Sequence, residues 1–376
     1  MRITWMRLVL IAFFLMLQAC GQGNVAPIMT PISTATVFSE PTATETPVFE
    51  FSPIPLKAGF GFRAFWLELY FTDPTSPFSA QNSGGLDGPL SAAIVAARES
   101  VDVAFNSLGV NSITEALLRV HNRGVTVRVV MEANNAAGRL NPQELMDAGI
   151  PIAYDNRDGV MNDRFVIIDH SQVWTGSLNY TSSGVFKENN NLIRIMSKEI
   201  ADNYTKEFEE MFLYDQFGPN VVPETPNPTV NIQGTQVEVL FSPDDVVISR
   251  LVQLLGEAQE SIYFLAYAFN SNTLGSVIRD RAVHNVNVVG VMEATQASEE
   301  FGLFKQAGLD VRLGNASEVM NHKVIIIDGR IVVMGSYDFT DKAENENDEN
   351  VLIIDNEKVA QKFMEEFQRI QSRAQP

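Results

Sequence analysis

Two short motifs carry the residue types that could do chemistry, and both read amide, any residue, cation, four residues, aspartate. The motifs are Asn162-x-Arg164-x4-Asp169 and Asn321-x-Lys323-x4-Asp328. Alternate residues of a strand share a face, so we expect the amide and the cation of each motif to point into one site. Cations beside amide donors favour an anion such as phosphate. Because an amide does not titrate near neutral pH, the asparagines indicate binding rather than catalysis.

The two cations need a counter-charge. Arg164 and Lys323 each directly precede an apolar strand pattern, and an unpaired cation in such a place is costly. Two interpretations stay open: retained anion binding, or structural pairing with carboxylates such as Asp338 and Glu349. We expect neither a metal nor a cofactor. Oxygen ligands from Asp338, Glu349 and the asparagines are a secondary alternative for a divalent cation.

The motifs belong to a long internal repeat. Ser100–Phe105 matches Ser261–Ala266 at an offset of 161 (261 − 100), and residues 161–169 match residues 320–328 at an offset of 159 (320 − 161). A period of this length indicates two domain-sized copies rather than a solenoid. Within each copy, apolar strand patterns alternate with amphipathic helix patterns, which predicts α/β sheets covered by helices.

The residues that follow each motif point to a known protein family. Ser177 and Asn179 follow the first motif, and Ser336 follows the second. With these residues the chain resembles the phospholipase D superfamily. The resemblance implies two α/β/α halves, residues 60–215 and 236–376, related by pseudo-two-fold symmetry. It also implies one phosphodiester site at their interface.

In the family pattern, His-x-Lys-x4-Asp-x6-Gly-Ser-x-Asn, one histidine attacks phosphorus and the other protonates the leaving alcohol. By this resemblance the phosphate-binding positions are Ser177, Asn179, Ser336 and Asp338, and the histidine-orienting positions are Asn190 and Glu349. The chain departs from the pattern at both histidines, which are Asn162 and Asn321. Losing a covalent nucleophile costs on the order of 10⁶ in rate. We therefore expect impaired or absent catalysis with retained binding of an anion or a partner, and whether the protein is an enzyme stays open.

Two alternatives remain from other readings of the sequence. His322 neighbours Lys323 and should face the opposite side of the strand, but a one-residue bulge would turn it inward and allow an active phospholipase D. Asp163 stands at the matching place of the first half, where desolvation could make it an acid or base. A nuclease-type member is the further alternative. The remaining histidines, expected at the surface, are His121, His170 and His284.

The start of the chain predicts export. Arg2 and Arg7 make the start of the chain basic. The apolar run that follows, residues 8–17, is too short to cross a bilayer, and this combination is typical of a signal peptide. The run passes into Leu17-Gln18-Ala19-Cys20, which resembles a bacterial lipobox, and Cys20 is the only cysteine. We expect residues 1–19 to be a signal peptide and Cys20 to be lipidated and anchored to a membrane outside the cytoplasm.

Composition limits the partners. Residues 20–59 are rich in proline and threonine and predict a tether, and residues 216–235 predict a linker between the halves. The formal net charge of −19 repels nucleic acid at long range. The expected partners are thus the membrane through Cys20 and a phosphodiester or other anionic ligand. The sequence identifies no protein partner.

Overall fold

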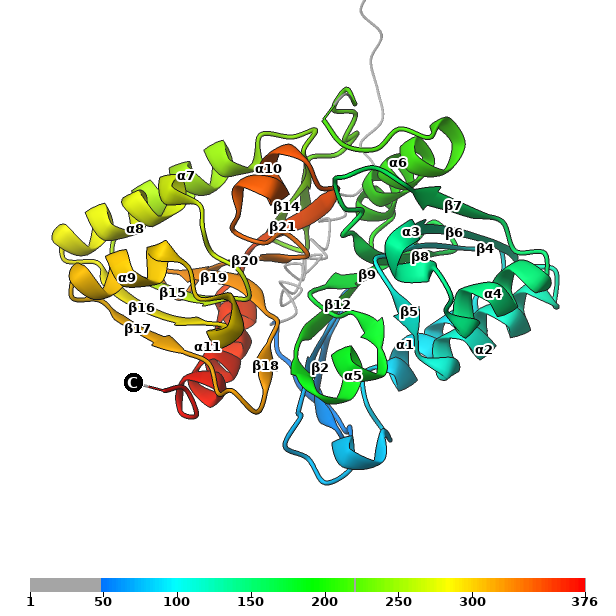
Figure 1. The fold of residues 1–376 in the computed structure, drawn as a ribbon, viewed down its shortest axis with the longest axis horizontal. Helices are drawn as coiled ribbons and strands as arrows, with labels where there is room; N and C mark the ends of the chain where they lie inside the picture. Colours follow the sequence, from blue (N-terminus) through cyan, green and yellow to red (C-terminus); the bar gives the residue numbers. More distant parts are fainter. Residues whose placement is uncertain (1–48, 220, 376) are drawn as a thin grey trace, which may run out of the picture. The chain divides into compact units, whose positions relative to one another are not determined.

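The computed structural model describes residues 49–219 and 221–375, in which two large mixed sheets form the two halves (Figure 1). The first half is built on a nine-stranded sheet. In spatial order its strands are β1 (Ser52–Ile54), β2 (Gly59–Ala64), β3 (Leu67–Thr72), β12 (Asn191–Ile195), β9 (Gln172–Gly176), β8 (Arg164–Ile168), β4 (Ser100–Phe105), β6 (Thr126–Glu132) and β7 (Ile152–Asp155).

The second half is built on an eight-stranded sheet with the same internal order. Its strands are β13 (Thr229–Ile232), β14 (Thr235–Ser242), β21 (Glu349–Asp355), β20 (Ile331–Gly335), β19 (Lys323–Ile327), β15 (Ser261–Ala266), β16 (Asn287–Met292) and β17 (Asp310–Leu313). Strand β8 pairs antiparallel with β4 so that Arg164 lies opposite Phe105, and β19 pairs with β15 so that Lys323 lies opposite Ala266. The matching register confirms the predicted repeat.

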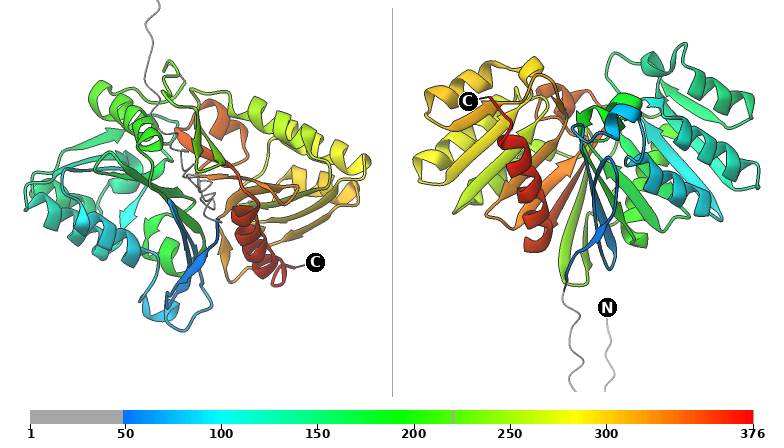
Figure 2. Two further views of the ribbon diagram at one scale, coloured as in Figure 1. Left: turned by 180° about the vertical axis from the view of Figure 1, so that it is seen from behind. Right: turned by 90° about the horizontal axis from the view of Figure 1, so that it is seen from below.

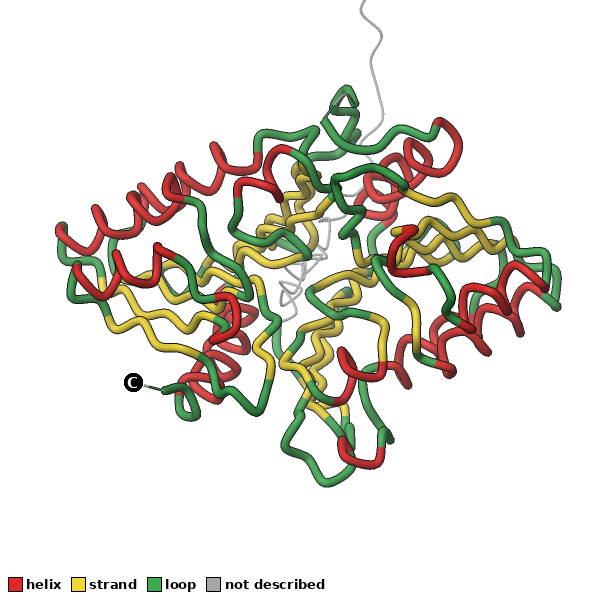
Figure 3. The backbone as a smooth tube through the Cα atoms, in the orientation of Figure 1, coloured by secondary structure: helices red, strands yellow, loops and turns green. Residues whose placement is uncertain are grey.

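Helices cover both sheets (Figures 1 and 3). The helices of the first half are α1 (Asp87–Ala96), α2 (Asn111–His121), α3 (Ala133–Ala136), α4 (Leu140–Asp147), α5 (Ser182–Phe186) and α6 (Lys198–Tyr214), with a 3₁₀ turn η1 (Ser79–Gln81). Those of the second half are α7 (Val247–Glu257), α8 (Asn272–Val283), α9 (Glu299–Gln306), α10 (Asp341–Asn345) and α11 (Glu357–Gln371), with η2 (Ala294–Gln296). None of the helices in the described ranges combines the length and apolar character that crossing a membrane requires.

Three apolar cores hold these layers together. The outer core of the first half lies under α1, α2 and α4, and that of the second half lies under α7, α8 and α9. A third core is shared, because α6 and α11 pack with the inner faces of both sheets. The predicted pair of α/β/α halves is thereby confirmed, and the views in Figure 2 show the two halves side by side.

The motif strands form where the sequence is continuously apolar. Strand β8, Arg-Phe-Val-Ile-Ile, and strand β19, Lys-Val-Ile-Ile-Ile, are buried at every position. A run without alternation suits a strand covered by side chains on both faces. The cation that starts each strand therefore lies at the edge of a buried sheet.

The folded part starts earlier than the sequence predicted. Strand β1 and the first residue of β2 lie within the predicted tether, because Phe49 and Phe51 pack against the shared core. The predicted linker contains β13, which pairs with β14 as a hairpin. The predicted signal peptide and Cys20 lie outside the described residues.

Candidate functional site

The two halves meet through short pairings directly before each motif. Strand β11 (Glu188–Asn189) pairs in parallel with β18 (Val319–Met320), and Met161 pairs in the same manner with Asp348. The backbone N–H of Asn162 donates to Asp348 O at 2.9 Å, and that of Asn321 donates to Asn189 O at 3.0 Å. Each motif is thus anchored to the opposite half, so the start of β8 and the start of β19 come together.

A pocket of about 350 Å³ lies at this meeting point. Its lining residues are Asn106, Val160, Asn162, Arg164, Asn179, Glu188, Tyr267, Val319, Asn321, Asp338 and Asn347. Except for Arg164, they form pairs at the repeat offsets, for example Asn162 with Asn321 (321 − 162 = 159) and Asn106 with Tyr267 (267 − 106 = 161). The predicted site at the interface is therefore a pocket to which both halves contribute equivalent positions.

In the first half, the cation is Arg164, a buried side chain with only part of its hydrogen bonding satisfied. One guanidinium nitrogen donates to Ser177 O, and another donates to Asn162 Oδ1 at 2.8 Å. Its Nε is buried and has no hydrogen-bond partner among the described residues, and the same is true of Asn179 Oδ1. A buried donor without a partner costs about 1–3 kcal/mol, so a turn of the guanidinium that brings this shielded nitrogen to a ligand oxygen in the pocket would be favoured.

In the second half, the cation is Lys323, which is fully buried and compensated from within. Its Nζ donates to Asn321 Oδ1 at 2.8 Å, lies 3.4 Å from Asp338 Oδ1 and sits 4.5 Å from the centre of the Tyr267 ring. Burial, partly opposed by the charge of Asp338, lowers the pKa of Lys323 to about 8. Of the two interpretations of the cations, internal pairing describes Lys323 and an incompletely paired donor describes Arg164.

The amide of Asn321 is fixed by the other half. Its Nδ2 donates to Asn190 Oδ1 at 2.9 Å and to Ser177 O at 3.2 Å. Asn190, expected at a position that orients a motif side chain, thus contacts the motif amide across the interface. Its counterpart Glu349 is buried behind the pocket, where its Oε2 accepts the backbone N–H of Asp338 at 3.2 Å. Burial and then the charge of Asp338 raise the pKa of Glu349 to about 8.

The two motif serines lie just behind the pocket wall. Ser177 Oγ donates to Asn190 Oδ1 at 2.9 Å, and Ser336 Oγ accepts the backbone N–H of Asn350 at 3.0 Å. Each serine follows a glycine with a φ near +150°. A Cβ at Gly176 would lie 2.5 Å from Asn191 O, so only glycine lets the neighbouring strand come this close. Neither serine lines the pocket, although both were expected to hold phosphate.

The motif aspartates lie at the opposite end of their strands. Asp169 accepts backbone N–H bonds from Arg98, Glu99 and Ser100 at 2.8–3.1 Å. Asp328 does the same for residues 259–261. Each aspartate follows a five-residue strand, so it is about 17 Å along the strand from the motif cation. Each aspartate fastens the segment that leads into the neighbouring strand, β4 for Asp169 and β15 for Asp328. Neither aspartate lines the pocket.

His322 does not take the bulged position that an active site would require. The ring is fully buried on the far side of β19: Asn191 Nδ2 donates to its Nδ1 at 2.8 Å, and its Nε2 donates to Glu366 Oε1 at 2.9 Å. Asp163 is likewise buried away from the pocket, where its Oδ1 accepts from Asn350 Nδ2 at 2.7 Å. Regular strand alternation prevails, because each side chain has a polar partner at the interface between the halves.

No histidine of the described ranges lines the pocket. The outward location of the three other histidines agrees with expectation, since His170 and His284 are exposed and His121 is partly exposed beside Ala148 O at 3.2 Å. With amides in place of imidazoles, the pocket offers hydrogen bonds and the cation Arg164 but no imidazole for phosphoryl transfer.

Sequence reasoning missed several lining residues, namely Asn106, Tyr267, Glu188, Asn347, Val160 and Val319. The repeat offsets relate them in pairs, so comparison of the halves around each motif could have found them. Glu188 adds a second carboxylate to the pocket beside Asp338. Of the two motif cations only Arg164 lines the pocket, where it faces these two carboxylates, and this makes the pocket less attractive to an anion than the cation alone would.

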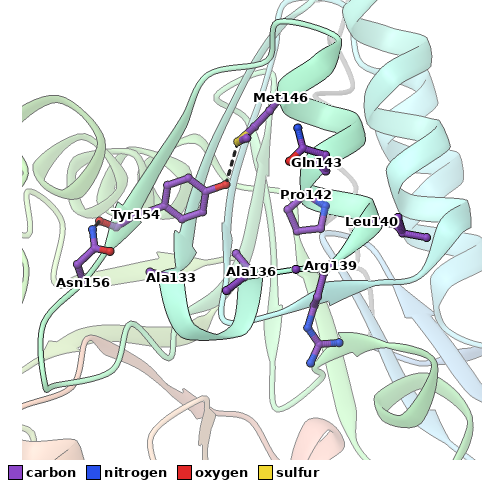
Figure 4. A pocket seen from close by; sticks show the side chains of 11 residues that line it. Ala133, Ala136, Arg139, Leu140, Pro142, Gln143, Met146, Tyr154 and Asn156 are labelled. Atoms are coloured by element: carbon purple, nitrogen blue, oxygen red, sulfur yellow. Dashed lines mark hydrogen bonds between the residues drawn. The ribbon is translucent and has the colours of Figure 1, made fainter.

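A larger pocket, of about 450 Å³, lies elsewhere, between the end of β6 and helix α4 (Figure 4). Arg139, Gln143 and Tyr154 line it, and the Tyr154 hydroxyl donates to Met146 Sδ at 3.2 Å. It contains none of the motif residues, so its size alone does not make it the candidate site.

Comparison with known proteins agrees with this geometry. The family model described as "Cardiolipin synthase, PLD-like domain" matches residues 90–212 and, a second time, residues 251–371. A phospholipase D of Rickettsia prowazekii is 28% identical over 136 residues, which is 35% of this chain and 66% of that protein. The human mitochondrial cardiolipin hydrolase is 33% identical over 132 residues, which is 34% of this chain and 52% of that protein. The chain thus spans from about half to just under two thirds of the length of these relatives.

Among solved structures, the phosphatidylserine synthase of Haemophilus influenzae is similar with a TM-score of 0.62 at 14% identity, covering 79% of this chain and 85% of that one. At this identity the likeness concerns the fold alone. Because the family model matches in both halves, on strands with the same order, the chain belongs to the phospholipase D-like family and carries two copies of its domain.

Proposed function

We propose that this phospholipase D-like protein binds a phosphate-bearing or other anionic ligand in the pocket between its halves, with catalysis impaired or absent. The observation that supports the proposal most directly is that Asn162 and Asn321 line the pocket at the two histidine positions. His322, the one histidine next to a motif cation, has both ring nitrogens engaged elsewhere.

The case for retained binding comes from Arg164. Its buried Nε lacks a partner among the described residues, and Asn162 holds another nitrogen of the guanidinium in place. A guanidinium presents its donors in a rigid fork that matches phosphate oxygens. Binding is expected to be modest, because Asp338 and Glu188 oppose a second negative charge in the pocket.

Binding of inorganic phosphate and of dimethyl phosphate should be measurable by calorimetry. Arg164→Gln should weaken binding at least about tenfold, since a charged hydrogen bond contributes roughly 1.5–3 kcal/mol and about 1.4 kcal/mol is a factor of ten. Arg164→Lys, which keeps the charge, should retain most of it. Affinity should also fall above pH 8, as Lys323 loses its proton.

Arg330→Gln is the matched control, because Arg330 lies in the turn between β19 and β20 of the second half, where it is exposed and pairs with Asp355, and should leave binding unchanged. Hydrolysis of bis(4-nitrophenyl) phosphate by the same preparation should stay at background. Turnover abolished by Arg164→Gln would contradict the proposed loss of catalysis, and binding insensitive to Arg164→Gln would place the ligand elsewhere.

We also propose that the protein is exported and held on a membrane outside the cytoplasm by lipid on Cys20. The support is the basic start, the short apolar run and the single cysteine at its end. Two or more acyl chains anchor a protein stably, whereas none leaves it free.

Cys20→Ser should therefore move the protein from the membrane fraction to the soluble fraction, and metabolic labelling with palmitate should be lost. Ser33→Ala, in the same proline- and threonine-rich stretch, should leave both unchanged. Membrane association that persists without Cys20 would contradict the anchor.

A further inference from the structure

Three carboxylates contributed by both halves converge at a separate pocket, which shares no lining residue with the motif pocket. Glu207 and Glu210 come from α6, and Asp244 follows β14 at the start of the second half. Each offers a ligand oxygen, and these oxygens lie within 4.8 Å of one another. They line a small pocket of about 10 Å³, closed on one side by residues 223–225 of the connecting segment. This volume suits a single water molecule or ion.

Two of the three side chains are buried without adequate compensation. Glu207 is 7% exposed and Glu210 is 5% exposed. No hydrogen bond from any described residue reaches the Glu207 carboxylate, which lines the small pocket. The nearest cation to Glu210 is Lys206, whose Nζ lies 3.9 Å away but pairs with Glu224 at 2.5 Å. Burial of acidic groups in this state is costly unless a counter-charge is bound.

The second half shows what the first half lacks. At an offset of 159, Glu207 corresponds to Glu366 (366 − 207), and Glu210 corresponds to Arg369 (369 − 210). Arg369 donates to Glu366 Oε1 at 2.6 Å, and His322 binds the same oxygen at 2.9 Å. The buried glutamate of the second half is therefore neutralised by its own neighbours. The first half places a carboxylate where the second half has the guanidinium.

A further buried side chain behind the cluster is also incompletely partnered. Asp163 corresponds to His322 (322 − 163 = 159) and is fully buried. Its Oδ1 accepts from Asn350, just as His322 uses one nitrogen for Asn191, but its Oδ2 has no partner among the described residues. His322 turns its second nitrogen to Glu366, and Glu207 occupies the position that corresponds to Glu366 in the first half. The charge of Asp163 adds to burial in raising the pKa of Glu207.

We propose that Glu207, Glu210 and Asp244 bind a hard divalent cation, Ca²⁺ in preference to Mg²⁺. An all-oxygen set of carboxylates is the chemistry that these ions take. Ca²⁺ is preferred because it accepts bidentate carboxylates and irregular geometry, whereas Mg²⁺ demands a near-ideal octahedron. The ion supplies the positive charge that Arg369 supplies in the other half.

The site connects parts of the chain that are distant in sequence. Helix α6 belongs to the first half, Asp244 belongs to the second, and residues 223–225 belong to the segment between them. A bound cation would therefore tie the halves together at a place separate from the motif pocket. Its main effect should be on stability, because it binds the folded chain and not the unfolded one.

The experiment titrates the full-length protein, first freed of metal with EDTA, with CaCl₂ and separately with MgCl₂, by calorimetry and by thermal unfolding. At a hundredfold excess of Ca²⁺ over its Kd, Tm should rise by about 5 °C. Mg²⁺ should give a smaller rise at the same concentration. Absence of both heat and Tm shift with either ion would overturn the proposal.

Glu207→Gln and Asp244→Asn should each abolish the Ca²⁺-dependent rise while raising the metal-free Tm, since each replaces an acid that is costly to bury beside other carboxylates with a neutral amide. A higher metal-free Tm shows that the variant folds, so a lost response cannot be attributed to misfolding. Asp202→Asn is the matched control on the same helix, because Asp202 pairs with Lys198 on the surface and should retain the full response. A Ca²⁺ response unchanged in Glu207→Gln and Asp244→Asn would place the cation elsewhere and overturn the assignment.

Discussion

Replacing Asn162 and Asn321 together by histidine should create phosphodiesterase turnover at least about 100-fold above that of the wild-type protein. The replacement supplies an imidazole to each half at positions that line the pocket, and a positioned acid or base contributes roughly 10²–10⁴ in rate. Cations and the motif backbone are already in place, since Arg164 and Lys323 start the adjoining strands. Release of 4-nitrophenol from bis(4-nitrophenyl) phosphate measures the gain.

Each single replacement is the control for the pair. Asn162→His or Asn321→His alone supplies a nucleophile without an acid, or an acid without a nucleophile, so both should stay near background. Asn190 is placed to accept a hydrogen bond from the new ring in the second half, as it does now from Asn321. If the double variant binds phosphate and still shows no turnover, the missing imidazoles are not what limits the wild-type site.

Glu349→Gln should stabilise the protein at pH 8 by roughly 2–4 kcal/mol and give no stabilisation at pH 4. Burial raises the pKa of Glu349 from 4.5 to about 8 in the folded protein. Between these values the unfolded chain has released the proton while the folded chain keeps it, so stability falls as pH rises. One pKa unit corresponds to about 1.4 kcal/mol. Glutamine has the shape of the protonated acid but gives up one hydrogen bond, because both Glu349 oxygens accept, from Asp338 N–H and from Asn347 Nδ2, and this offsets roughly 1 kcal/mol of the gain.

Denaturant unfolding in EDTA at pH 4, 6 and 8 tests this pH dependence. The wild-type protein should lose stability across the series, and Glu349→Gln should lose less. Glu346→Gln, at an exposed position in the loop that leads into β21, should follow the wild type. A variant with an unchanged slope would mean that Glu349 is ionised in the folded protein across this range.

The sequence by itself determined the repeat, the class of fold and the pocket at the interface. The repeat was readable because two copies preserve the same buried strands and the same motif, and such strands leave long apolar runs. Strand alternation also placed His322 correctly on the far side, since a side-chain period of two needs no tertiary information. The spacing of each motif likewise predicted that the amides of Asn162 and Asn321 point into the pocket.

Tertiary structure decided which polar groups meet. The contact of Asn190 with Asn321 and the compensation of Lys323 by Tyr267 depend on how distant segments pack, which local spacing does not encode. Asp169 and Asp328 were expected at the site but bond backbone N–H groups elsewhere, because the length of their strands puts them at the far end of the sheet. The carboxylates around Glu207 become a cluster only when α6 packs beside the start of the second half.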